Sequence, residues 1–195
     1  MNVIDPPRTS STGSLVFITL AGWFSLVFGL GLAGYLEDPP RPLIPIALAS
    51  LAIGTWLASR RPTVRAWVGG LDVRALVAVH IIRWPIGIWF LQMYEEGRLP
   101  GELAQLAGWG DIATGMLAVL ALAFDERGAI GRRALLVFNT LGLVDILLVV
   151  GTAQKVLLID AAPVEIGFPF VLLPMFVVPL VIVAHVWTFV RLRRT

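Results

Sequence analysis

Two histidines lie inside long apolar stretches of this chain, and each is six residues from an arginine. His80 follows Arg74, and His185 precedes Arg191. If both stretches are membrane helices with these arginines on one side, the rise per residue places each imidazole about 9 Å from its arginine. Two imidazoles at one level on different helices can be the axial ligands of a b-type haem. The alternative is that each histidine hydrogen bonds across a helix interface.

A second set of polar residues also lies within apolar stretches. Arg83, Asp111 and Asp145 carry charge, and Asn139 is near the level of the histidines. A charged side chain in hydrocarbon costs about 2.5 to 3.5 kcal/mol on insertion scales, so these groups are expected to pair. Arg83 and Asp145 are predicted to meet as an ion pair, with Asp111 near the outer end of its span. Such a cluster is either a structural clamp or a site for an ion, a proton or an anionic group, and Asn139 is expected to bridge helices.

Three further residues form a second tier of candidates. Glu95 and Glu96 follow the apolar stretch that carries His80, and they are expected to be solvated loop charges. Trp84 is expected to pack between helices rather than to bind a substrate.

The sequence lacks the residues and motifs that several kinds of catalytic or binding site require. The chain has no cysteine, which removes disulfides, thiol catalysis and cysteine-ligated metals. It also contains no phosphate-binding glycine loop, no dinucleotide fingerprint and no HExxH pair. An enzyme is therefore not the favoured interpretation, and no catalytic residue is assigned.

The elements that must position these residues are membrane helices. The 195 residues are 57% hydrophobic and only 14% charged, and the apolar runs are about as long as the ~20 residues that cross a bilayer. The sequence predicts an all-α polytopic membrane bundle with a disordered tail, 1–14, and one domain, 15–195. The six expected spans are 15–35, 43–59, 71–94, 109–124, 134–152 and 168–190.

The connections between spans carry the orientation signal. Residues 60–74 are predicted to be a basic loop, and Leu99, Leu103 and Leu106 predict a short interfacial helix before the fourth span. Arginines gather on one side of the six-span topology, at positions 8, 60, 61, 65, 74, 127, 132, 133, 191, 193 and 194, against Arg41, Arg98 and Lys155 on the other. The positive-inside rule then places both termini in the cytoplasm. The expected location is the cell membrane, which is the inner membrane if the protein is bacterial.

Three functions remain open on this basis. The first is a membrane protein with an intramembrane polar ligand site between spans three and six, acting in small-solute or proton-coupled transport. The second is a redox subunit with haem b on His80 and His185, the cofactor otherwise being unknown. The third is a non-catalytic subunit or assembly factor. The partners expected are the lipid bilayer and either a second copy or a larger membrane complex; the net charge of +2 is attributed to orientation and not to nucleic acid.

Overall fold

The computed structural model describes residues 11–36, 49, 57, 60–125, 128–160, 162, 164 and 167–193. Within those ranges the chain is helical and forms no strand. The elements are α1 (Ser11–Leu32), α3 (Pro62–Gly69), α4 (Val73–Ala78), the 3-10 turn η1 (Val79–Ile82), α5 (Arg83–Glu95), α6 (Gly101–Leu122), α7 (Ala129–Gln154), the π-helical turns η2 (Lys155–Ile159) and η3 (Leu173–Val177), and α8 (Val178–Leu192).

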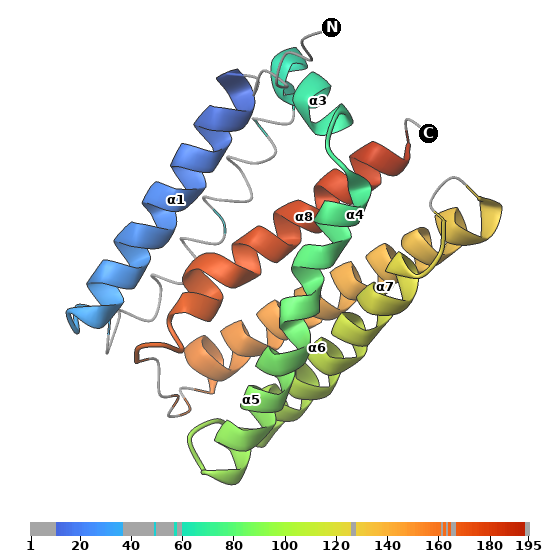
Figure 1. Cartoon of the computed structure of the whole chain (residues 1–195). Helices are drawn as coiled ribbons and strands as arrows, with labels where there is room; N and C mark the ends of the chain where they lie inside the picture. The colour runs from blue at the N-terminus through green and yellow to red at the C-terminus, as the bar shows by residue number, and fades with distance from the viewer. Residues whose placement is uncertain are drawn as a thin grey trace, which may run out of the picture.

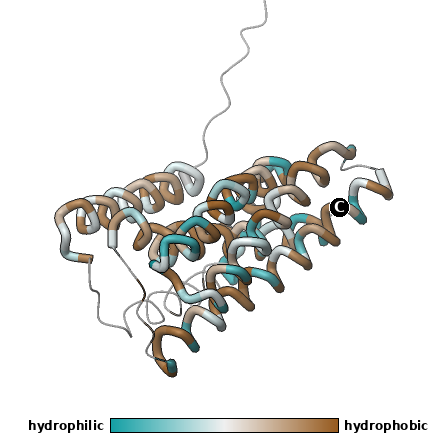
Figure 2. Tube along the Cα trace, turned by 90° about the horizontal axis from the view of Figure 1, so that it is seen from below, coloured by the Kyte–Doolittle hydropathy of each residue, from teal (hydrophilic) through white to brown (hydrophobic). Residues whose placement is uncertain are grey.

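Five helical segments of the described chain are long and apolar enough to cross a membrane. They are Thr12–Leu32, Val73–Glu95, Gly101–Leu122, Ala129–Ile159 and Leu173–Leu192. Apolar residues run along the length of these helices (Figure 2). The predictions of an all-helical fold and of a membrane protein are thus confirmed, while the expected second span, 43–59, lies outside the described residues.

The start of the fourth span differs from expectation. No separate interfacial helix precedes it, because Leu103 and Leu106 belong to one continuous helix, α6, which begins at Gly101. The glycines around Trp109 do not break this helix, because they are packing positions: a Cβ atom on Gly108 would lie 2.6 Å from the Leu91 side chain. Residues 109–124 are therefore only the second part of the crossing.

Other helix boundaries shift by a few residues. α1 begins at Ser11, so residues 11–14 are helical and not part of a tail. α7 begins at Ala129, five residues before the expected 134, and the last crossing begins at Leu173 rather than at 168. The expected basic loop contains α3, which Pro62 starts because proline fits the first helical position without losing a hydrogen bond.

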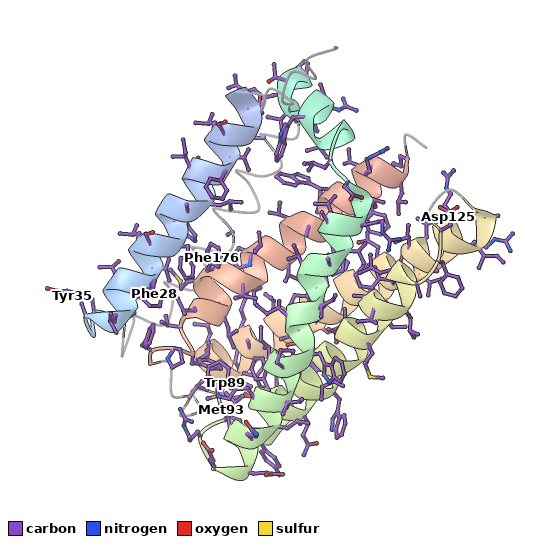
Figure 3. The ribbon with its side chains drawn as sticks, viewed as in Figure 1. Phe28, Tyr35, Trp89, Met93, Asp125 and Phe176 are labelled. Atoms are coloured by element: carbon purple, nitrogen blue, oxygen red, sulfur yellow. The ribbon has the colours of Figure 1, made fainter. Side chains whose placement is uncertain are left out.

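The elements α4 to α8 form a bundle, and α1 lies at its edge (Figure 1). In sequence order α5 contacts α6, α6 contacts α7 and α7 contacts α8, while α4 packs back on α8. α1 reaches the bundle through aromatic residues: Phe24 meets Phe176 of η3, with ring centroids 5.1 Å apart, and the Trp23 indole N–H donates to the Met175 carbonyl. Figure 3 shows Phe28 on α1 and Phe176 at the beginning of the last crossing.

Arginines gather at one end of the bundle, which we call the arginine-rich end. This end holds α3, the beginnings of α1, α4 and α7, and the ends of α6 and α8 (Figure 1). Arg74 donates to the carbonyls of Leu122 and Phe124, and Arg132 donates to that of Leu192. These guanidinium groups satisfy carbonyls that the helix ends leave without intrahelical partners, and their charge complements the helix dipole.

Glycines allow the closest helix contact, between α5 and α6. A Cβ atom on Gly87 would lie against the carbonyl of Gly108 and 2.8 Å from the Ile112 nitrogen, both backbone atoms of α6. We expect Gly87→Ala to lower the free energy of unfolding by about 1 to 3 kcal/mol, because the two backbones must separate. Thermal unfolding in detergent measures the change.

The matched control is Gly151→Ala on α7. A Cβ atom there meets nothing within 4 Å. Since alanine has the higher helix propensity, this variant should be neutral or slightly stabilised. Equal stability of both variants would show that the α5–α6 contact is looser than described.

Candidate functional site

Arg83 is the centre of the polar cluster and is only 2% exposed. Its Nε donates to Asp111 Oδ1 at 2.5 Å, and its Nη1 donates to the Gly142 carbonyl at 3.2 Å. Its Nη2 pairs with Asp145 Oδ2. One guanidinium on α5 therefore binds α6 through Asp111 and α7 through both Gly142 and Asp145. We call Arg83, Asp111 and Asp145 the triad.

The local sequence explains why Arg83 lies at a change of helix type. Pro85 has no backbone N–H, so it cannot donate to the carbonyl of Ile81 four residues earlier. The chain adopts the tighter 3-10 form over Val79–Ile82 and resumes as α5 at Arg83. This junction carries both His80 and Arg83 into the bundle interior, where each is buried.

Asp111 lies deeper than the sequence indicates. Because α6 begins at Gly101, Asp111 is ten residues from its start, about 15 Å along the helix, and 11 residues from its end. The expected place near an outer end is thus wrong: Asp111 is at the centre of the crossing, and 4% of it is exposed.

Asp145 is the more accessible carboxylate of the triad. Its side chain is 18% exposed, against 6% for Asp111. Its Oδ1 lies against Gly110 of α6, where any side chain would collide with it. Thr114 hydrogen bonds to the Asp145 carboxylate. A glycine on α6 thus provides the space for a carboxylate of α7.

The charges of the triad do not balance if both carboxylates are ionised. One guanidinium faces two carboxylates, and no other cationic side chain of the described residues pairs with either one. An uncompensated charge in a low-dielectric interior is strongly unfavourable. The arrangement is therefore suited to hold one more positive charge, such as a proton.

A second polar layer lies next to the triad, on the side of the arginine-rich end. His80 and His185 are both fully buried, and their ring centroids are 3.9 Å apart with an angle of 35° between the planes. Phe138 packs against both rings. The two histidines thus meet at one level, as their equal spacing from Arg74 and Arg191 indicates.

Asn139 fixes the orientation of His185. Its amide Nδ2 donates to the His185 carbonyl at 3.0 Å, so its Oδ1 is an acceptor and faces the Nδ1 of the same histidine at 2.8 Å. Nδ1 then carries the proton, and a neutral His185 has its lone pair on Nε2. Within the described residues, that Nε2 and both ring nitrogens of His80 have no hydrogen-bond partner.

Gly142 joins the two layers. Its carbonyl accepts from Arg83, while a Cβ atom on it would lie 2.7 Å from His185 Cε1 and 2.9 Å from the Thr114 methyl group. Sequence reasoning missed Thr114 and Gly142 as site residues. Their spacing from the two aspartates could have identified them. Thr114 follows Asp111 by three residues and Gly142 precedes Asp145 by three, which places each pair on one helix face.

The histidine pair does not fit a haem between its rings. A ring separation of 3.9 Å is van der Waals contact, which leaves no space for a porphyrin or for an iron with a ligand bond on each side. The donor set around the pair is also short of metal ligands. No group of three histidine, aspartate or glutamate side chains that could hold a metal ion occurs in the described part of the chain.

The second-tier residues lie outside the cluster. Trp84 is 44% exposed, and its backbone packs on Gly115 of α6. Glu95 and Glu96 are exposed at the end of α5, where Glu96 pairs with Arg98 at 2.9 Å. The structure thus brings together Arg83, Asp111 and Asp145, with Asn139, His80 and His185 adjacent.

Removal of the buried Arg83 cation should strongly lower the free energy of unfolding. Arg83→Gln leaves two carboxylates without their partner, and we expect a loss of about 3 to 5 kcal/mol in the free energy of unfolding. Adding Asp111→Asn and Asp145→Asn should recover part of that loss, because the unpaired charges are gone. Arg98→Gln, which breaks an exposed pair, is the control and should cost at most about 1 kcal/mol. A triple variant as unstable as the single one would show that packing and not charge dominates.

The side-chain amide of Asn139 should also contribute to the free energy of unfolding. Asn139→Leu has a similar volume but leaves the Nδ1–H and carbonyl of His185 unpaired, for an expected loss of about 1 to 3 kcal/mol. The neighbouring Thr140→Val removes a polar group on the exposed face of α7 and should change stability by less than about 0.5 kcal/mol. Equal unfolding temperatures for the two variants would contradict the described hydrogen bonds.

Comparison with known proteins places the chain in one family. No curated protein and no solved structure gives a significant match. Residues 42–193 match the model of a family described as a domain of unknown function, DUF8737. This match covers the helices that carry the triad and the histidine pair, and it extends over more than half of the chain. The chain therefore belongs to the DUF8737 family.

Proposed function

We propose that this membrane protein binds and releases a proton at the triad and uses that exchange in the coupled transport of a small solute. The observation that carries the proposal is the pairing of one buried guanidinium with two carboxylates. With one proton bound the cluster is neutral, and without it the cluster has a net negative charge in mid-membrane. A group with two such states can couple a pH gradient to a change in helix contacts.

Asp145 is the carboxylate that exchanges the proton in this mechanism. Its side chain is the more exposed of the two, and it is nine residues, about 14 Å, before the end of α7. Protonation of Asp145 weakens its ion pair with Arg83 and leaves the pair between Arg83 and Asp111 intact. The ion pair between α5 and α7 is then the contact that depends on the proton, while the hydrogen bond from Arg83 to the Gly142 carbonyl does not.

The histidine pair extends the polar groups toward the arginine-rich end. His80 precedes Arg83 by one 3-10 turn, and the unpartnered Nε2 of His185 is next to Gly142, whose carbonyl binds Arg83. A neutral imidazole can accept a proton on one nitrogen while donating from the other. The pair would carry protons between the triad and the arginine-rich end.

The orientation and organisation that support this function are part of the proposal. The arginine-rich end faces the cytoplasm, as the positive-inside rule requires, and the chain from α1 onward forms a single domain in the cell membrane. The exposed apolar side chains of α1, such as Phe17 and Leu15, contact lipid or a second copy. A complete path for a solute through so small a chain would need an oligomer.

Two other functions compete with this one. A haem-binding redox subunit requires the two histidines to separate, and their contact at 3.9 Å does not favour it. A non-catalytic subunit or assembly factor would use the triad only to fix helix order. That alternative predicts that no flux of protons or solute depends on the triad.

The test is infrared difference spectroscopy of the purified protein in lipid nanodiscs during a pH titration. We expect the carbonyl stretch of a protonated carboxyl group to appear on acidification and to be lost in Asp145→Asn. Asp160→Asn, the same change at an exposed residue, should keep the band. An identical band in wild type and Asp145→Asn, or a wild-type spectrum without a titrating buried carboxyl, would contradict proton exchange at Asp145.

A flux measurement in proteoliposomes tests the transport step. Vesicles that contain a pH-sensitive dye should show acid-driven dye changes with the wild type and with Asp160→Asn, and these should fall to the rate of empty vesicles with Asp145→Asn. Thermal unfolding of each variant confirms that it is folded. If a titrating band is present but all vesicles behave like empty ones under every solute tried, the proton site stands and coupled transport does not.

A further inference from the structure

A basic pocket lies between α3 and α8. These two helices come together at the arginine-rich end (Figure 1). Its volume is about 510 Å³. We call it the α3–α8 pocket, and its lining residues are Arg60, Val64, Arg65, Val68, Trp187, Val190 and Arg193. It contains no residue of the triad or of the histidine pair.

The sequence builds this pocket from two helix faces. On α3, Val64 and Val68 are four residues apart and share one face, and Val68 is 1% exposed. On α8, Trp187 and Val190 are three residues apart and share another. Trp67 of α3 meets Trp187 edge to face, with centroids 5.3 Å apart, so the two helices are held together beside the pocket.

The rim of the pocket is cationic and its floor is apolar. Arg60, Arg65 and Arg193 are exposed residues, and their side chains line the pocket. Valine side chains and the indole of Trp187 form the rest of the lining. A ligand that fits this lining has an anionic group with several acceptor oxygens, attached to an apolar part.

Trp187 provides an independent sign of a missing acceptor. Its indole Nε1 is buried and has no hydrogen-bond partner within the described residues. A buried donor left unpaired is unfavourable, and an indole nitrogen can only donate. An oxygen of a ligand in the pocket would satisfy this N–H.

The depth of the pocket distinguishes among ligands with a phosphate group. Trp187 is five residues, about 8 Å, from the end of α8, which is the level of the interface between headgroups and hydrocarbon. A phospholipid there can place its phosphate among the arginines and its glycerol esters near the indole and the valines. A free phosphate ion would leave the apolar floor uncovered.

We propose that the α3–α8 pocket binds the phosphate group of an anionic phospholipid. The arginines at the rim hold the headgroup, and the Trp187 N–H donates to a phosphate or ester oxygen. Clusters of arginine at the cytoplasmic side of membrane helices recognise anionic lipids through the same charge complementarity. Bound lipid would join α3 to α8 and stabilise the arginine-rich end.

The test is a thermal shift of the delipidated protein in neutral detergent. Mixed micelles with phosphatidylglycerol should raise the unfolding temperature in a saturable, salt-sensitive way. Micelles with phosphatidylcholine at the same mole fraction and sodium phosphate alone should raise it much less. An equal shift with phosphatidylcholine would overturn charge recognition, and an equal shift with sodium phosphate would overturn the assignment to a lipid.

Variants locate the site. Arg193→Gln should weaken phosphatidylglycerol binding about fivefold, since one interfacial arginine contributes about 1 kcal/mol. Arg133→Gln removes the same charge from an exposed arginine at the same end but outside the pocket, and it should change the affinity far less. Equal effects of the two variants would show diffuse attraction to the whole end and would overturn the pocket.

Trp187→Phe tests the hydrogen bond. It keeps an aromatic ring against Trp67 and removes only the indole N–H, so we expect weaker phosphatidylglycerol binding with little change in the lipid-free unfolding temperature. Unchanged affinity in a folded Trp187→Phe protein would overturn the role of this N–H. If that variant does not fold, the comparison of Arg193→Gln with Arg133→Gln still decides the site.

Discussion

The rest of the bundle depends on how Arg83 is neutralised. A guanidinium in mid-membrane is tolerated only when it is paired, and Arg83 uses Nε, Nη1 and Nη2 on acceptors from two other helices. These contacts set the rotation and the height of α5, α6 and α7 relative to one another. The hydrophobic effect does not drive helices together inside lipid, because lipid tails are as apolar as the helix surfaces. Polar contacts and close backbone packing of this kind drive the association instead.

Small residues make this pairing geometrically possible. Gly87 and Gly108 let α5 and α6 approach at backbone distance, Gly110 leaves room for the Asp145 carboxylate, and Gly142 offers its carbonyl to Arg83. Each of these glycines faces a neighbouring helix. Gly142 also contacts both polar layers, because its carbonyl accepts from Arg83 of the triad and its Cα lies next to the His185 ring.

The two ends of the protein complement this interior. Arginines at one end satisfy helix carbonyls and surround the α3–α8 pocket, while the opposite end carries exposed pairs such as that of Lys155 with Glu102. Among the residues that the structure describes, charged side chains thus lie where water or headgroups can solvate them, except in the triad. An interior cluster with one cation and two carboxylates is costly to build, and that cost is the physical reason to connect it with proton exchange.

The sequence by itself determined the class of fold and the inventory of polar groups. Run lengths of apolar residues indicated membrane helices, and charges inside those runs had to be paired, because hydrocarbon solvates neither charge nor backbone. Only the tertiary structure decided the depth of Asp111 and the meaning of Gly108 and Gly110. A glycine pair around a tryptophan is compatible with a helix break or with helix packing, and the choice depends on whether another backbone lies against it. Here the backbone of Gly87 on α5 lies against Gly108, and α6 is one continuous helix from Gly101. Asp111 therefore reaches Arg83 at the centre of the bundle.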